Sequence, residues 1–231
     1  MNWLIQTFTS SIGRKITVAL TGLFLIIFLI GHVSGNFLLF KDDGGQAFNE
    51  YTEFMTHNQL ILVVRYLLYF AIIAHVLQTL ILTLHNKKAR PVEYAVNNRQ
   101  ENSTWSSRNM GILGTLVLVF IVMHMSNFWW EVKFGDIPMV SYESRGEVKD
   151  LYSVVVSSFK ELWLVIFYVV MMIFLALHLS HGFQSAFQTM GWRHPKYTPL
   201  VQKIGMAFAV LVPILFALFP VYIYLFVDYN G

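Results

Sequence analysis

The sequence contains no cysteine and few charged residues, and each shortage excludes a class of protein. Without cysteine the chain can form neither a disulfide nor a thiolate-ligated iron–sulfur cluster. Only 13% of the 231 residues are charged, compared with about 25% in soluble domains. Hydrophobic residues make up 56%, and the mean hydropathy is +0.55. The composition therefore indicates an integral membrane protein, whose net charge of +3 comes from helix ends and not from a nucleic-acid surface.

Five apolar stretches are long enough to cross a bilayer, which takes about 20 helical residues. They predict an all-α membrane protein with a single domain, residues 1–231, and helices at about 16–40, 60–84, 110–130, 162–190 and 204–227. The first stretch is too long for a signal peptide and no cleavage pattern follows it. Pro213 and Pro220 predict a kinked or broken fifth helix, which would pack beside a bundle of the first four. No internal repeat is obvious.

The charges between these stretches predict the orientation of the chain. With the N-terminus in the cytoplasm, the inner side has ten basic and two acidic residues, and the outer side has six basic and eleven acidic ones. The inner acidic residues are Glu93 and Glu101, and the inner basic ones are Arg14, Lys15, Lys87, Lys88, Arg90, Arg99, Arg108, Arg193, Lys196 and Lys203. Tryptophans also mark the predicted helix ends, at Trp105, Trp129, Trp130, Trp163 and Trp192. Five crossings then place the C-terminus outside.

Each of the first four predicted helices contains one deeply placed histidine. Counting at 1.5 Å per residue, His32 and His124 lie about 13 and 10 Å from the outer ends of their helices. His75 and His178 lie about 25 Å from the outer ends of theirs. The four histidines therefore form two levels, with helices one and three supplying the outer level and helices two and four the inner level.

Ionisable side chains at this depth usually have a function and a partner. Neutral imidazole binds transition metals and haem iron, and with no cysteine present a haem would be held by histidine or methionine without a covalent bond. Two histidines at each level would suit two haems, one above the other, and are too few for a zinc site. A single intramembrane histidine could instead make an interhelical hydrogen bond or belong to a proton relay. Small residues that could admit a flat macrocycle are Gly22, Gly31, Gly35, Gly111, Gly114 and Gly182.

Other candidates surround these four histidines. His181, one turn after His178, could replace it as a ligand, bind a haem propionate or form a hydrogen bond. Arg65 on the outer side and Arg108 on the inner side are candidate partners for haem propionates, together with Arg14, Lys15 and Lys203.

Several motifs together resemble one family. They are TGLFLIIFLIGH at residues 21–32, Ala74–His75 after an apolar run, SRNMG at 107–111 before His124, and His-x-x-x-Gly at 178–182 followed by aromatics and Gly191–Trp192. The chain resembles, over essentially its whole length, the membrane-anchor cytochrome b subunits of succinate dehydrogenases and fumarate reductases. The likeness is to the single-polypeptide, five-helix, two-haem type, and most of all to bacterial b558-type subunits.

The resemblance implies that His32 and His124 ligate a distal haem b and that His75 and His178 ligate a proximal one, with His178 preferred over His181. It implies flavoprotein and iron–sulfur subunits on the cytoplasmic face of a bacterial inner membrane, and electron transfer to a quinone, with menaquinone expected. Succinate itself would react on the flavoprotein and not on this chain. Some relatives have a glutamate two residues before the helix-four ligand, linked to proton movement, where this chain has Ala176.

A quinone site needs hydrogen-bond donors and a route for protons. The candidates on the outer side are Glu50, Glu53, His57 and Asn58, and those on the inner side are Ser107, Ser180 and His181. Three alternative functions are open: a cytochrome b anchor of a hydrogenase or formate dehydrogenase, a haem-free proton-coupled transporter, and a purely structural anchor. The sequence determines neither the direction of turnover nor whether the complex dimerises.

Overall fold

The computed structural model describes residues 6, 8–89 and 103–228, and has five helices that are long and apolar enough to cross a membrane. They are α2 (Ser11–Asn36), α4 (Gln59–Lys88), α7 (Met110–His124), α10 (Leu162–Thr189) and α11 (Thr198–Phe226). The 3-10 helix η1 (Phe37–Phe40) extends α2, while the π-helix η2 (Met125–Trp130) and α8 (Glu131–Phe134) extend α7. The predicted number and order of long apolar helices are therefore confirmed. Arg90, Glu93, Arg99 and Glu101, used to predict the orientation, lie outside the described residues.

Polar caps and prolines explain where the helix bounds differ from the predicted ones. Ser10 caps α2 by accepting a 3.0 Å hydrogen bond from the Gly13 amide, so the helix begins before the apolar run. Helix α11 has Pro199 in its first turn and continues through Pro213 and Pro220. Of the two predicted alternatives, a kink or a break, the break is therefore wrong. Both interior prolines are buried, and prolines are tolerated in membrane helices where packing and local adjustment compensate for the lost hydrogen bond.

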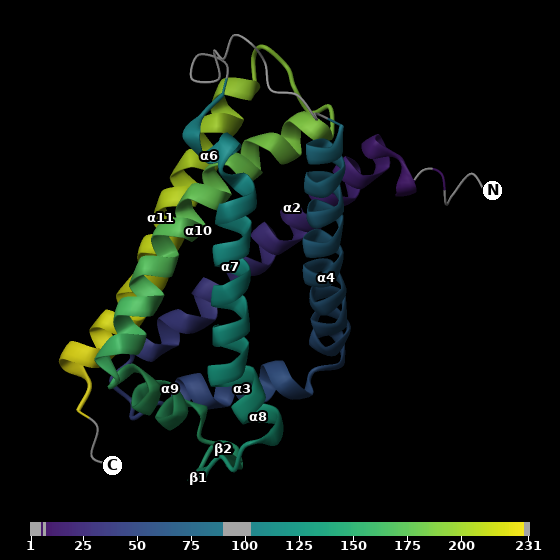
Figure 1. The fold of residues 1–231 in the computed structure, drawn as a ribbon. Helices are drawn as coiled ribbons and strands as arrows, with labels where there is room; N and C mark the ends of the chain where they lie inside the picture. Colours follow the sequence, from purple (N-terminus) through teal and green to yellow (C-terminus); the bar gives the residue numbers. More distant parts are fainter. Residues whose placement is uncertain (1–5, 7, 90–102, 229–231) are drawn as a thin grey trace.

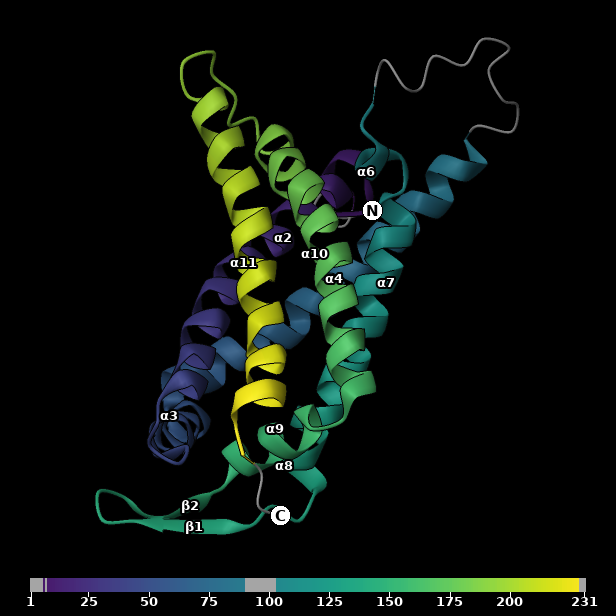
Figure 2. The same ribbon diagram turned by 90° about the vertical axis from the view of Figure 1, so that its left-hand side faces the viewer.

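Shorter elements gather at one end of the bundle. They are α3 (Gln46–His57), α9 (Leu151–Phe159) and an antiparallel hairpin of β1 (Met139–Tyr142) and β2 (Gly146–Lys149), with Val140 opposite Val148. In Figure 1 they lie at the bottom beside the C-terminal end of α11, whereas α6 (Trp105–Arg108) lies at the other end. The hairpin extends to one side of the bundle in Figure 2. It is a small exception to the predicted all-α class.

Helix α10 is the centre of the packing. It packs against α11, α2 and α7, and α2 in turn packs against α4. The interface with α11 is close because Gly205 lacks a side chain and the Phe183 ring lies on its backbone. Most buried apolar residues belong to α2, α10 and α11, whereas α4 and α7 contribute only Ala71 and Leu113 among the residues described. As predicted, the histidine-free α11 packs beside the other helices.

The first four long helices form two similar halves. Each half contains a long helix, a short helix at the same end of the bundle and a second long helix: α2, α3 and α4 in the first half and α7, α9 and α10 in the second. The spacing Gly-x5-Phe-x3-His occurs in the first helix of each, as Gly22–Phe28–His32 and as Gly114–Phe120–His124. His75 and His178 are each the seventeenth residue of their helix. The repeat rests on few positions, so it becomes evident only when the helices are aligned by their structure.

A fully buried asparagine joins the short elements of the two halves. Asn49 on α3 donates from Nδ2 to Tyr142 Oη at 3.0 Å and to Asp150 Oδ1 at 2.8 Å. Its Oδ1 accepts a 2.8 Å bond from the Tyr152 amide. These three bonds connect α3 to the hairpin and to the start of α9. Because buried polar groups left without partners are costly, the network should make this end of the molecule rigid.

We predict that Asn49→Ala lowers the free energy of unfolding of this end by about 2–4 kcal/mol, because Tyr142, Asp150 and Tyr152 lose their partner. Thermal unfolding in detergent should start at lower temperature, and trypsin should cleave the hairpin at Arg145 or Lys149 faster. Asn109→Ala is the matched control, because that amide makes one local 2.9 Å bond to the Trp105 carbonyl. Equal trypsin sensitivity of the two variants would contradict the prediction.

Candidate functional site: two histidine pairs

His32 and His124 meet near the end of the bundle that contains α3 and α9. Their ring centroids are 5.7 Å apart and the ring planes make an angle of 82°. Each ring stacks on a phenylalanine one turn earlier in its own helix, His32 on Phe28 at 5.3 Å and His124 on Phe120 at 5.7 Å. Phe216 of α11 also contacts His32, at 5.5 Å. The outer pair, His32 and His124, is therefore flanked by aromatic rings of α2, α7 and α11.

His75 and His178 form the second pair, deeper in the bundle. Their ring centroids are 6.4 Å apart, with an angle of 67° between the planes. Each is packed on a glycine of the neighbouring helix. A Cβ atom on Gly22 would lie 3.3 Å from His75 Cε1, and one on Gly114 would lie 3.7 Å from His178 Cε1. The two histidines of this pair thus have equivalent positions in the two halves of the fold.

Both pairs connect helices that are not packing neighbours. The outer pair connects α2 to α7, and the inner pair connects α4 to α10. Within the described ranges, the backbones of α2 and α7 make few close contacts, and so do those of α4 and α10. The same is true of α4 and α7. The side chains therefore meet across the interior. Each pair could ligate one metal ion or one haem iron, and no cluster of three or more potential metal-ligating side chains occurs in the described part of the chain.

The Nδ1 atoms of these rings have different partners. His75 Nδ1 lies 3.1 Å from the Thr21 hydroxyl on α2, and His124 Nδ1 lies 3.3 Å from the Tyr168 hydroxyl on α10. His178 Nδ1 is buried and has no hydrogen-bond partner among the described residues. Buried Gln78 Oε1 on α4 and Asn127 Nδ2 on η2 are likewise without a partner there. The interior thus contains polar atoms whose hydrogen-bonding capacity the chain itself leaves unused.

The other residues predicted to be near a cofactor have local contacts. Arg65 Nη2 donates to the carbonyls of Met55 and Thr56 at 3.1 and 3.2 Å, which caps the last turn of α3. Arg108 donates to the Ser103 carbonyl beside α6. His181 is partly buried, one turn after His178. Of the six glycines expected to admit a flat group, two, Gly22 and Gly114, would place a Cβ within 4 Å of one of these histidines.

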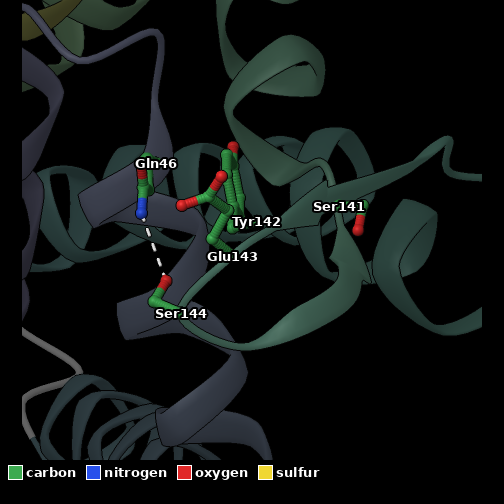
Figure 3. Close-up of a pocket in the computed structure, with 5 residues that line it drawn as sticks. All are labelled: Gln46, Ser141, Tyr142, Glu143 and Ser144. Atoms are coloured by element: carbon green, nitrogen blue, oxygen red, sulfur yellow. Dashed lines mark hydrogen bonds between the residues drawn. The ribbon is translucent and has the colours of Figure 1, made fainter.

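The four outer residues predicted for a quinone site lie on or beside α3. His57 Nδ1 pairs with Glu53 at 2.9 Å, and Asn58 caps α4 by accepting from the amides of Leu60 and Ile61 at 2.9 and 3.2 Å. Glu50 accepts hydrogen bonds from the side chains of Ser144 and Gln46, and Figure 3 shows these two donors at an open hollow of the hairpin. All four therefore have partners within this end of the structure.

Three residues with structural contacts were not predicted from the sequence, two of them at the histidines. Thr21 and Tyr168 belong to neighbouring helices, and Asn49 ties the outer elements together. Of these three residues, only Thr21 could have been recognised from the sequence. A threonine directly before a glycine in an apolar helix offers a hydroxyl beside a gap in the helix surface, where a side chain of another helix can bind. Tyr168 stands among many aromatic residues of α10 and could not be distinguished from them.

Glu50 makes a pH dependence testable. The hydrogen bonds from Ser144 and Gln46 lower its pKa below the usual carboxyl value. A lowered pKa in the folded state adds stability above the unfolded pKa of about 4.3, and this stability is lost as the pH falls through the folded value. We predict that Glu50→Gln reduces the acid-induced decrease in thermal unfolding temperature by a small amount, and that Ser144→Ala reduces it as well, because the folded pKa of Glu50 then moves back toward the unfolded value. An acid profile of Glu50→Gln identical to that of the wild type would refute the assignment.

Comparisons with known proteins add no identification: the chain matches no protein-family model, and neither the curated proteins nor the solved structures that were searched include a match.

Proposed function

We propose that the chain is a dihaem cytochrome b, the membrane-anchor subunit of a succinate:quinone oxidoreductase. It would pass electrons between an iron–sulfur subunit and membrane quinone. The observation that carries the proposal is the arrangement of the histidines: two pairs at two depths, each spanning two helices that do not pack on one another. Interhelical hydrogen bonding alone would favour helices in direct contact. A purely structural anchor would need no histidine at these depths.

The residues fit the proposed group in number and position. A bond between a metal and an imidazole nitrogen is about 2 Å long, so two imidazoles on opposite sides of one iron have ring centroids roughly 6 Å apart. The observed separations are 5.7 and 6.4 Å. An ordinary edge-to-face contact of two rings covers the same range, so the distances support the proposal only together with the separation of the helices. The pairing of His75 is with His178, which supports that residue over His181 as the ligand.

A haem held by two histidines transfers single electrons and leaves no open iron position for oxygen. The chain's own residues would hold, orient and insulate it. Phe28, Phe120 and Phe216 surround the outer pair with apolar rings, which keeps water from the imidazoles. Thr21 and Tyr168 contact the nitrogen of His75 and His124 that does not bind metal. Such outer partners fix the ring orientation and raise the basicity of the ligand.

The charge and the hydrogen-bonding residues at the two ends of the bundle suggest where the proposed subunits and the quinone would bind. The predicted cytoplasmic end has the basic segments at both ends of the 85–109 stretch and at 191–203, which would suit docking of the flavoprotein and iron–sulfur subunits. His75 and His178 lie nearer that end, in agreement with a proximal assignment. Glu50, Glu53, His57 and Asn58 remain our candidates for a quinone site at the opposite end, where a quinone oxygen would have to exchange with their present partners.

We predict that the purified wild-type protein shows a b-type reduced absorption band and contains two haems per chain by the pyridine haemochrome assay. His124→Ala should retain one haem, because His75 and His178 hold the other. His178→Ala should likewise retain one haem. His181→Ala, a histidine removed from the same helix, is the control and should retain two. Absence of haem from the wild type would refute the proposed function, and loss of one haem from the control would move the helix-four ligand to His181.

The respiratory complex can be identified by its electron donor. In native membranes, succinate should reduce the haem of this chain, and malonate, a competitive succinate analogue, should block that reduction. Hydrogen and formate are the matched alternative donors and should have no effect. Reduction by formate or hydrogen but not by succinate would retain the cytochrome and assign it to a different complex.

A further inference from the structure

Thr21 and Gly22 on α2 together form a seat for one edge of the His75 ring. The Thr21 hydroxyl is 3.1 Å from His75 Nδ1. The neighbouring Gly22 leaves the space next to Cε1 and Nδ1 open, since a Cβ atom there would lie 3.3 and 3.7 Å from these two atoms. Thr21 is only 9% exposed, so water does not compete for its hydroxyl. Two consecutive residues therefore form the seat: Thr21 contributes a hydrogen bond, and Gly22 contributes space because it has no side chain.

The hydrogen-bond distances around Thr21 favour His75 as the donor in this contact. The Thr21 hydroxyl has one proton, and it donates this proton to backbone carbonyls of its own helix, to Thr17 at 2.7 Å and to Val18 at 3.1 Å. The shortest of its contacts is the one to the Thr17 carbonyl, so in the contact with His75 we assign the hydroxyl as the acceptor. The proton in this contact therefore belongs to His75 Nδ1. A neutral imidazole with a proton on Nδ1 has its lone pair on Nε2.

The second half of the fold lacks this hydroxyl. Counting from the shared Gly-x5-Phe-x3-His spacing, the position of Thr21 is taken by Leu113. His178 rests beside Gly114 as His75 rests beside Gly22, but its Nδ1 has no partner among the described residues. Since the packing on glycine is common to both halves, the hydrogen bond is a separate feature of His75. The two histidines of the inner pair are thus oriented by different means.

We propose that Thr21 is a positioning residue that fixes His75 in the Nδ1–H tautomer and presents its Nε2 lone pair to a metal, which makes His75 the more basic ligand of the inner pair. The inference rests on the proposed function, because it concerns a ligand of the inner haem. Accepting a hydrogen bond from Nδ1–H raises the electron density of the imidazole. This favours the oxidised, more positive iron over the reduced one and lowers the midpoint potential.

The test uses Thr21→Val, which has nearly the same shape but lacks the hydroxyl. Haem content, midpoint potentials and the low-spin ferric electron paramagnetic resonance spectrum are measured on the purified protein. We expect the potential of one haem to become more positive, its resonance to shift and its affinity for the site to fall by about tenfold or more. The affected haem should be the one that is missing from His178→Ala. Thr21→Ser should restore the wild-type values.

Thr17→Val is the matched control, since Thr17 lies one turn earlier on α2 and donates only to the Gly13 carbonyl, at 3.0 Å. It should leave both haems unchanged. If Thr21→Val does not accumulate, the smaller Thr21→Ala variant provides the same readouts. Unchanged potentials and spectra at full haem content in the Thr21 variant, or a shift confined to the other haem, would overturn the positioning role and leave the cytochrome assignment intact. A wild-type protein without haem would overturn both.

Discussion

The structure depends on the need of each intramembrane histidine for a partner. An imidazole in the hydrocarbon region cannot use water, so its polar atoms must be satisfied by other helices or by a bound group. Here the four imidazoles find one another in pairs, and the pairs lie between helices that have little contact otherwise. The bundle therefore has two parts. Helix α10 forms a packed apolar core with α2 and α11, and the histidine pairs lie between helices that this core does not bring into direct contact.

This division explains the uneven burial of the helices. Helices α4 and α7 are as apolar as the rest, yet each has a single buried residue among those described. In a soluble protein such helices would be unstable, but lipid can cover the outer faces of a membrane helix. Their inner faces present His75 and His124 and few large buried side chains. Helix α4 therefore joins the bundle through its packing on α2, and α7 through its packing on α10, while the histidine pairs connect them across the interior, since direct packing of α4 on α7 is slight.

Features set by single helices could be predicted from the sequence, and those set by pairs of helices could not. The five crossings and the two histidine levels follow from apolar run length and from the rise per residue. The continuity of α11 through Pro213 and Pro220 depends on its packing against α10, which the sequence does not display. The hydroxyl that meets His75 belongs to Thr21 on α2, a contact between two helices that neither apolar run displays by itself. For the same reason, only two of the six noted glycines have a histidine within contact distance.

The outer elements then have a mechanical role that follows from the same geometry. The two halves pack on one another through α2 and α10, whereas α4 and α7 barely touch, so on the side of α4 and α7 other contacts join the halves. Trp129 on η2 donates a 2.7 Å hydrogen bond to the Tyr69 hydroxyl on α4, which joins the halves directly. Asn49 joins α3 of the first half to the start of α9 in the second. A bound group between two imidazoles tolerates only small changes in their separation, so rigid links at the end of the bundle that contains α3 and α9 would add to the helix packing in preserving the pairs.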